Sequence, residues 1–201
     1  RLNNFIKNKR GLYSFWIFFV LFIISLFADF IANEKPLLIK YENEFYYPIL
    51  QSYSETTFGG DFETEADYRD PFVKNLINAS GWMIMPIIPY KYNTIIRNID
   101  SPAPSPPSAM NWLGTDDQAR DVLSRLIYGF RISILFGFTL TFFSMIIGVS
   151  AGAIQGYFGG KTDLFFQRFM EIWSAIPTLY VLIILASVIQ PNFWWLLIIL
   201  L

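Results

Sequence analysis

Residues 11–28 read GLYSFWIFFVLFIISLFA and contain no charged side chain. Two further runs, residues 132–160 and 172–201, also lack charge. About 18 or more consecutive apolar residues are enough for a helix to cross a hydrocarbon core. A soluble core would instead alternate apolar and polar residues with the period of a helix or a strand. The three runs therefore predict an all-α polytopic membrane protein that folds in a lipid bilayer.

The composition argues against several other classes of protein. Lys and Arg number 15 and Asp and Glu number 16, for a net charge of −1, so a nucleic-acid partner is not indicated. The chain has neither cysteine nor histidine, which removes thiolate metal sites and the usual general base. A Ser-His hydrolase or a membrane metalloprotease is therefore hard to build, whereas an aspartyl-type intramembrane enzyme stays open. We expect no bound cofactor and no metal.

The distribution of positive charge predicts how the spans are oriented. Residues 1–10 contain Arg1, Lys7, Lys9 and Arg10 and no acid, so the N-terminus is expected in the cytoplasm. The apolar stretch that follows is too long for a signal peptide and lacks a small-residue cleavage site. The predicted spans are residues 11–32, 132–154 and 164–189, with the start of a fourth at 193–201. We expect this fourth span to continue beyond Leu201.

Between the first two spans the sequence becomes polar. Residues 33–100 contain short extended segments at 35–41 and 44–50, with turn points at Gly59-Gly60 and Gly81. We predict a small periplasmic insertion of α+β or irregular structure. Residues 101–110 read SPAPSPPSAM, and this density of proline favours a stiff linker.

Residues 111–131 are predicted to form an amphipathic periplasmic helix that leads directly into the second span. Thr115 and Gln118 have the spacing of a capping box, and Asp116 precedes the polar face where a helix N-terminus favours negative charge. Asp121 and Arg125 are placed to form an i,i+4 ion pair. Such a helix belongs at the membrane surface or against another subunit. Its polar face comprises Arg120, Asp121, Ser124, Arg125 and Tyr128.

A cytoplasmic turn is predicted at residues 155–163, because Lys161 marks its side of the membrane. The turn lacks phosphate-loop spacing, since Gln155 stands where the first glycine of that motif would be. Within the third span Pro177 predicts a kink, and Arg168 and Glu171 form a possible intramembrane ion pair. The turn residues of interest are Gly156, Gly159, Gly160, Lys161 and Asp163.

Several short motifs resemble a known family. The segments WLGTD (112–116), RDVLSRL (120–126), GYFGG (156–160) and IP (176–177) resemble the second permease subunit of dipeptide and oligopeptide ABC importers. The segments KPLL (35–38), FGG (58–60) and QPNFWW (190–195) are similar to its Yej-type branch. That branch is associated with oligopeptides and with the peptide-nucleotide antibiotic microcin C.

The resemblance implies a MetI-like permease of the bacterial inner membrane that is not itself an enzyme. Its partners would be a second permease subunit, an ATP-binding subunit that holds ATP and Mg, and a periplasmic solute-binding protein. The helix at 111–131 would form a periplasmic gate or partner contact at the outer mouth. Its residues of interest are Thr115, Asp116, Arg120, Asp121, Arg125, Tyr128 and Arg131.

Two points of the resemblance differ or stay open. Ala119 stands where the family pattern has glycine, which puts a close backbone contact there in doubt. The family's ATPase-coupling loop is expected beyond Leu201. A membrane-anchored sensor that reads a ligand with its periplasmic domain is the alternative function; it would need a cytoplasmic signalling module and fewer spans.

Overall fold

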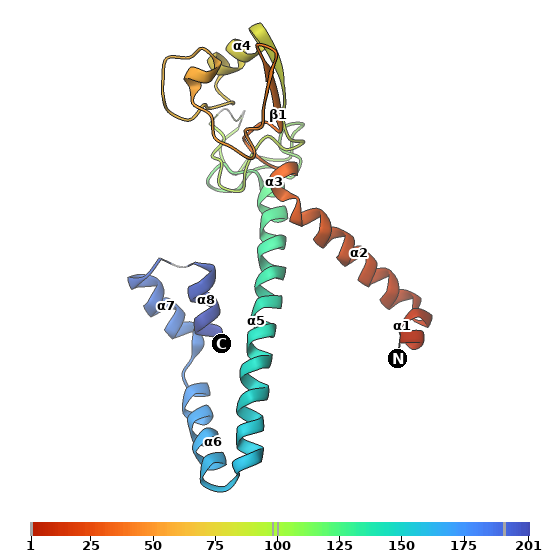
Figure 1. Cartoon of the computed structure of the whole chain (residues 1–201), viewed down its shortest axis with the longest axis vertical. Helices are drawn as coiled ribbons and strands as arrows, with labels where there is room; N and C mark the ends of the chain where they lie inside the picture. Colours follow the sequence, from red (N-terminus) through yellow and green to blue (C-terminus); the bar gives the residue numbers. More distant parts are fainter. Residues whose placement is uncertain (1, 98, 100, 191) are drawn as a thin grey trace. The chain divides into compact units, whose positions relative to one another are not determined.

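The computed structural model describes residues 2–97, 99, 101–190 and 192–201, and it divides into two units, residues 1–131 and 132–201 (Figure 1). The first unit contains helices α1 to α4, strands β1 to β3 and the beginning of α5. The second contains the rest of α5 and helices α6 to α8. Two helices, α2 (Lys9–Leu26) and α5 (Val122–Phe158), are long and apolar enough to cross a membrane.

The first predicted span, residues 11–32, is divided between α2 and a four-residue helix that follows it. Helix α1 (Leu2–Lys7) precedes α2, whose N-terminus is capped by Asn8, because its Oδ1 accepts a hydrogen bond from the Gly11 amide at 3.2 Å. Helix α2 ends at Leu26, and the four-residue helix α3 (Ala28–Ile31) follows. Most side chains of α2 are exposed, as expected for a helix whose solvent is lipid.

The polar segment after α3 folds as a small α+β structure. Strand β1 (Leu38–Tyr41) pairs antiparallel with β2 (Glu44–Tyr46) and with β3 (Gly81–Ile84), in the order β2-β1-β3. The loop residues Glu42 and Asn43 have φ angles of +47° and +72°, as a two-residue type I′ hairpin requires. Strand β2 ends at Tyr46, so it is shorter than the extended segment predicted at 44–50.

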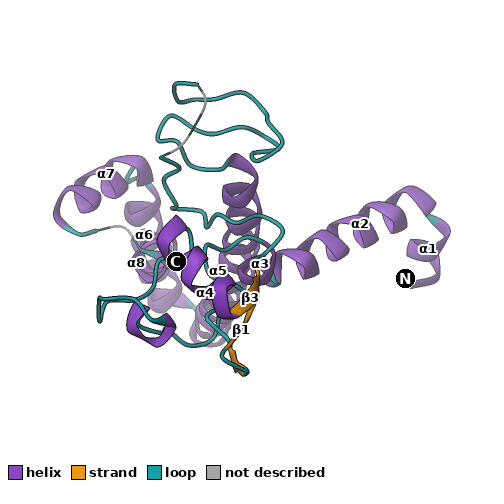
Figure 2. Ribbon diagram, turned by 90° about the horizontal axis from the view of Figure 1, so that it is seen from above, coloured by secondary structure: helices purple, strands orange, loops and turns teal. Residues whose placement is uncertain are grey.

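Helix α4 (Pro71–Ser80) was not predicted, although its start carries a clear local signal. Asp70 caps it by accepting a hydrogen bond from the Phe72 amide at 2.8 Å, and Pro71 occupies the first helical turn. Val73 and Ile77, four residues apart, bury the apolar side of the helix. Helix α4 packs beside β3, as Figure 2 shows in purple and orange.

An aromatic cluster forms the core of this α+β segment. Phe58 is fully buried at the end of the short 3-10 helix η1 (Glu55–Phe58). Its ring contacts those of Tyr41, Tyr46, Tyr53 and Tyr68 edge-on, with ring centroids 5.4–6.4 Å apart. Edge-to-face aromatic pairs are stabilising beyond the area that they bury, so this one side chain organises the packing of the segment.

In the second unit the predicted turn and kink both appear as helix breaks. Gly159 and Gly160, with φ angles of +55° and +54°, separate α5 from α6 (Gly160–Ser174). Helix α7 (Thr178–Val188) begins after Pro177 and is bent by 68° from α6. The predicted third span, 164–189, is thus two helices and not one kinked helix, because Pro177 has no amide to donate and takes an extended ψ of 110°. Helix α8 (Phe193–Leu200) follows.

We predict that Phe58→Ala destabilises the α+β segment by about 3–5 kcal/mol, the usual cost of deleting a buried aromatic ring. The matched control is Phe62→Ala, because Phe62 is 64% exposed. The measurement is the thermal unfolding midpoint of the purified protein in detergent. Equal midpoints for the two variants would contradict the central place of Phe58.

Candidate functional site

The predicted helix at 111–131 begins only at Val122, so residues 111–121 are a loop. The capping box at Thr115 is therefore wrong. Thr115 Oγ1 instead accepts a hydrogen bond from the Ser105 amide at 2.9 Å, and the Thr115 amide donates to the Ser105 carbonyl at 3.1 Å. These bonds fasten the proline-rich stretch, predicted as a linker at 101–110, onto the loop.

Two residues with left-handed backbone explain why the loop is not helical. Gly114 has a φ of +73°, and a Cβ there would lie 2.3 Å from the Ser105 carbonyl oxygen. Ala119 has a φ of +58°, a conformation that glycine adopts freely and alanine does not. The predicted helix at 111–131 is therefore wrong at position 119, where the backbone has the conformation that the glycine of the family pattern adopts freely.

Asp116 is the centre of an ion-pair group within this loop. Its Oδ1 accepts hydrogen bonds from the backbone amides of Gln118 at 3.0 Å and Arg120 at 2.9 Å. Its Oδ2 accepts from Arg120 Nε at 2.8 Å and pairs with the Arg125 guanidinium. Burial acts to raise the pKa of Asp116, but the bonds from Arg120, Gln118 and Arg125 outweigh it and lower this pKa to about 2.

Asp121, and not Thr115, caps the start of α5. Its Oδ1 accepts a hydrogen bond from the Ser124 amide at 2.7 Å, three residues into α5, and its Oδ2 accepts from Asn111 Nδ2 at 2.8 Å. The predicted pair between Asp121 and Arg125 is therefore wrong, since Arg125 pairs with Asp116. Asp121 is 1% exposed, so it does not share a solvated face with the two arginines.

A third carboxylate, Asp29, joins α3 to α5. Arg131 Nη1 donates to Asp29 Oδ2 at 2.8 Å. The Tyr128 hydroxyl lies 2.7 Å from Asp29 Oδ1 and 2.9 Å from the Ala32 carbonyl oxygen, so its one proton is shared between two acceptors. The Arg131 guanidinium also lies 4.8 Å from the centre of the Tyr128 ring.

Asp29 was not singled out from the sequence, although a signal was present. It is the one acid in the predicted first span, and an ionisable residue at membrane depth is costly unless it is paired. Together these residues form what we call the junction cluster. It comprises Asp29, Asn111, Asp116, Arg120, Asp121, Arg125, Tyr128 and Arg131.

The predicted residues of the second unit lie apart from one another along its helices. Gly156 lies within α5, whereas Gly159 and Gly160 form the break and Lys161 is exposed in the first turn of α6. Asp163 accepts weakly from Gln167 Nε2, at 3.4 Å and 3.5 Å. Arg168 and Glu171 form the predicted ion pair at 2.6 Å, with side chains 75% and 61% exposed.

The junction cluster connects separate parts of the first unit by charge-assisted hydrogen bonds. Each of its carboxylates accepts bonds from residues distant in sequence or from the start of α5, and charge-assisted bonds of this kind are strong. Within residues 2–97, 99, 101–190 and 192–201 no group of three or more candidate ligands is placed to hold a metal ion. The cluster therefore fixes where α5 begins relative to α3 and the loop.

We predict that Asp116→Asn destabilises the first unit by about 1–3 kcal/mol, because it leaves Arg120 without its ionic partner. The low pKa of Asp116 means that its contribution is complete above the unfolded pKa of 3.8 and disappears as pH falls towards 2. The measurement is thermal unfolding of the purified protein from pH 8 to pH 2. The neighbouring Asp117, which is exposed, provides the control Asp117→Asn, and an equal loss in both variants would refute this role.

The chain is similar to known proteins of membrane transport systems. Residues 144–201 match the family described as binding-protein-dependent transport system inner membrane component. Over 98% of its length the chain is 52% identical to the inner membrane ABC transporter permease protein YejE of Escherichia coli (strain K12). Over the same share it is 49% identical to the peptidoglycan transport system permease protein YejE of Agrobacterium fabrum (strain C58). The chain spans 58% of the length of each of these two proteins.

Similarity to a dipeptide permease is shorter. The dipeptide transport system permease protein DppC of Haemophilus influenzae is 46% identical over 40% of this chain and 27% of its own length. All three relatives are named as permease proteins, in agreement with the expectation that the chain is not itself an enzyme. The similarity to the two YejE permease proteins therefore includes the α+β segment, the junction cluster and the matched residues 144–201.

Proposed function

We propose that the chain forms part of the membrane-spanning subunit of an ATP-driven importer. This importer would move oligopeptides or peptide-like compounds, of the microcin C type, across the bacterial inner membrane. The observation that carries the proposal is the 52% identity to a permease over 98% of the chain. The sensor alternative has no support from relatives that are all named as permeases.

The names of the relatives support a substrate that contains a peptide. One relative is named for peptidoglycan transport and another for dipeptide transport. Fragments of peptidoglycan carry short peptides, so a short peptide is the chemistry that these substrates share. We therefore propose short peptides, free or attached to another group, as the substrate class of this importer.

The topology of the proposed importer follows from its charges. Lys7, Lys9 and Arg10 lie before or at the start of α2 and Lys161 lies at the break between α5 and α6. Both groups would be cytoplasmic by the positive-inside tendency, with a single crossing by α2 and another by α5 between them. The α+β segment would then be periplasmic, where a solute-binding protein can reach it.

Two further partners of the importer would supply energy and the second half of the transport path. A second permease subunit would complete the path, and an ATP-binding subunit in the cytoplasm would hold ATP and Mg. Binding of ATP can move the permease only if it favours one of two arrangements. We propose that the junction cluster acts as the gate or partner contact, because it holds the start of α5 to α3 and to the loop at 111–121.

The test is uptake of a radiolabelled tripeptide by cells that lack their own peptide importers. These cells would express the full-length permease with its second permease, ATP-binding and solute-binding subunits. We expect saturable uptake that stops when the ATP-binding subunit is inactivated. Arg120→Ala with Arg125→Ala should lower uptake at least several-fold at an unchanged membrane level, whereas alanine at the exposed Asp117 and Gln118 should not. Correctly inserted protein that imports no peptide would overturn the proposal.

A further inference from the structure

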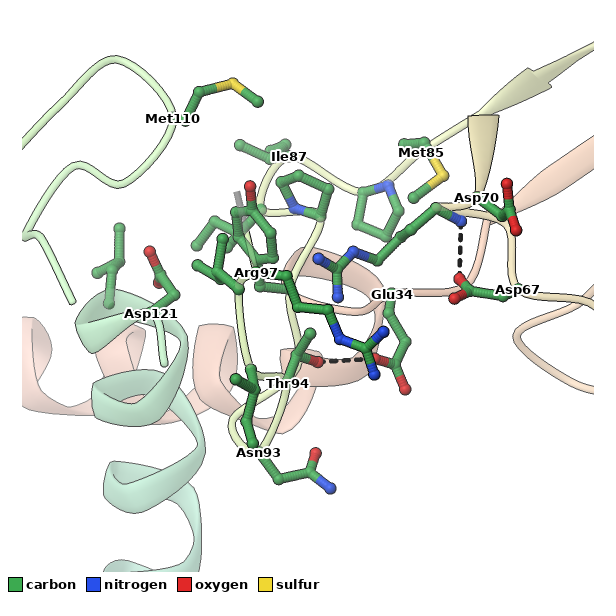
Figure 3. A pocket seen from close by; sticks show the side chains of 18 of the residues that line it. Glu34, Asp67, Asp70, Met85, Ile87, Asn93, Thr94, Arg97, Met110 and Asp121 are labelled. Atoms are coloured by element: carbon green, nitrogen blue, oxygen red, sulfur yellow. Dashed lines mark hydrogen bonds between the residues drawn. The ribbon is translucent and has the colours of Figure 1, made fainter. Parts of the chain in front are cut away.

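The α+β segment and the loop before α5 enclose a pocket of about 1040 Å³ (Figure 3). Ligand pockets commonly measure about 300–1,000 Å³ and combine apolar walls with a few polar groups. The apolar wall here includes Met85, Ile87, Tyr90, Met110 and Trp112. The pocket lies in the first unit, and one of its lining residues, Leu123, belongs to the first turn of α5.

The carboxylates of the pocket are already engaged by the fold. Glu34 Oε2 accepts from the Thr94 hydroxyl at 2.7 Å, a bond drawn in Figure 3, and Asp67 Oδ1 accepts from the Arg69 amide at 2.9 Å. Asp70 caps α4 and Asp121 caps α5. Each of the four acids thus accepts a hydrogen bond from a neighbouring group of the protein.

The pocket is also lined by three cationic residues. Among the residues that the structure describes, Arg69, Lys74 and Arg97 form no ion pair. The Arg69 guanidinium lies 5.2 Å from the centre of the Tyr90 ring, a contact that leaves its N–H donors available. Figure 3 shows the Arg97 side chain extending into the pocket. Arg69, Lys74 and Arg97 are therefore the groups of the pocket that can offer N–H donors and positive charge to an anionic ligand.

We propose that this pocket binds the carboxylate end of a short apolar peptide. Arg69 and Arg97 would hold the carboxylate, because a guanidinium presents paired N–H donors that match its two oxygens. Lys74 adds a point charge, and Met110 and Trp112 offer contact to the apolar side chains of the peptide. The choice of a peptide over another organic anion rests on the proposed function, whereas the preference for a carboxylate rests on the pocket alone.

The experiment measures direct binding to the purified full-length permease in phosphatidylcholine nanodiscs, by isothermal titration calorimetry. The probes are N-acetyl-trileucine with a free carboxylate and the same peptide as its C-terminal amide. We expect the acid to bind about tenfold or more tightly than the amide, the size of effect that one charge-assisted interaction gives. Equal affinity for acid and amide would overturn the proposal.

Variants locate the site. Arg69→Ala with Arg97→Ala should weaken binding of the acid about tenfold or more, and the matched change to lysine at both positions should weaken it less. The control is Lys40→Ala, because Lys40 lies on β1 and does not line the pocket. An unchanged affinity in the double alanine variant, with an unchanged unfolding midpoint, would place the peptide elsewhere.

Two further measurements distinguish a peptide-carboxylate site from a general anion site, and this proposal from the proposed importer function. Inorganic phosphate that displaced the peptide at equal concentration would show a site for anions in general and overturn the assignment to peptide carboxylates. Binding needs neither the ATP-binding subunit nor the solute-binding protein. Normal binding without uptake in cells would therefore contradict only the importer, and uptake without binding would contradict only the pocket.

Discussion

A bilayer offers no water to backbone N–H and C=O groups, so a segment that crosses it must satisfy them internally. Helix α5 meets this constraint over 37 residues, and α2 meets it over 18. Their large apolar side chains are exposed along most of their length, with Phe18, Phe138 and Val149 as examples. Apart from the four charged residues of α6, the charged residues lie before α2, in its first turn, in the first turns of α5 or in the segment between these two helices.

The junction cluster contains charged residues of that segment and of the first turns of α5. Asp29, which follows α2, is neutralised by Arg131, and Asp116 is neutralised by Arg120 and Arg125. A carboxylate near the lipid is expensive unless it is paired in this way. The same ion pairs fix the start of α5 relative to α3 and to the loop at 111–121.

Sequence reasoning worked best where a single physical pattern decides the outcome. Runs without charge identify α2 and α5, and Gly159 with Gly160 identifies the break after α5. It failed where tertiary contacts override local preference. Thr115 looks like a helix cap, but it bonds to Ser105, ten residues away. From the sequence, Asp121 looks like an exposed ion-pair partner of Arg125. In the structure Asp121 is buried and accepts a hydrogen bond from Asn111, and Arg125 forms its ion pair with Asp116. Helix α4 was missed because ten residues with two buried positions give only a weak periodic signal.

We predict that lipid surrounds α5, and that the α+β segment and the α5–α6 break are reached from opposite sides of the membrane. The printed sequence has no cysteine, so single cysteines in a cysteine-free full-length protein can report position. The exposed residues Gln51, Val149 and Lys161 suit this purpose. A membrane-impermeant maleimide added to spheroplasts should label Gln51→Cys at once, Lys161→Cys only after the membrane is opened, and Val149→Cys in neither case. Labelling of Gln51→Cys and Lys161→Cys from the same side, or of Val149→Cys from water, would contradict the account.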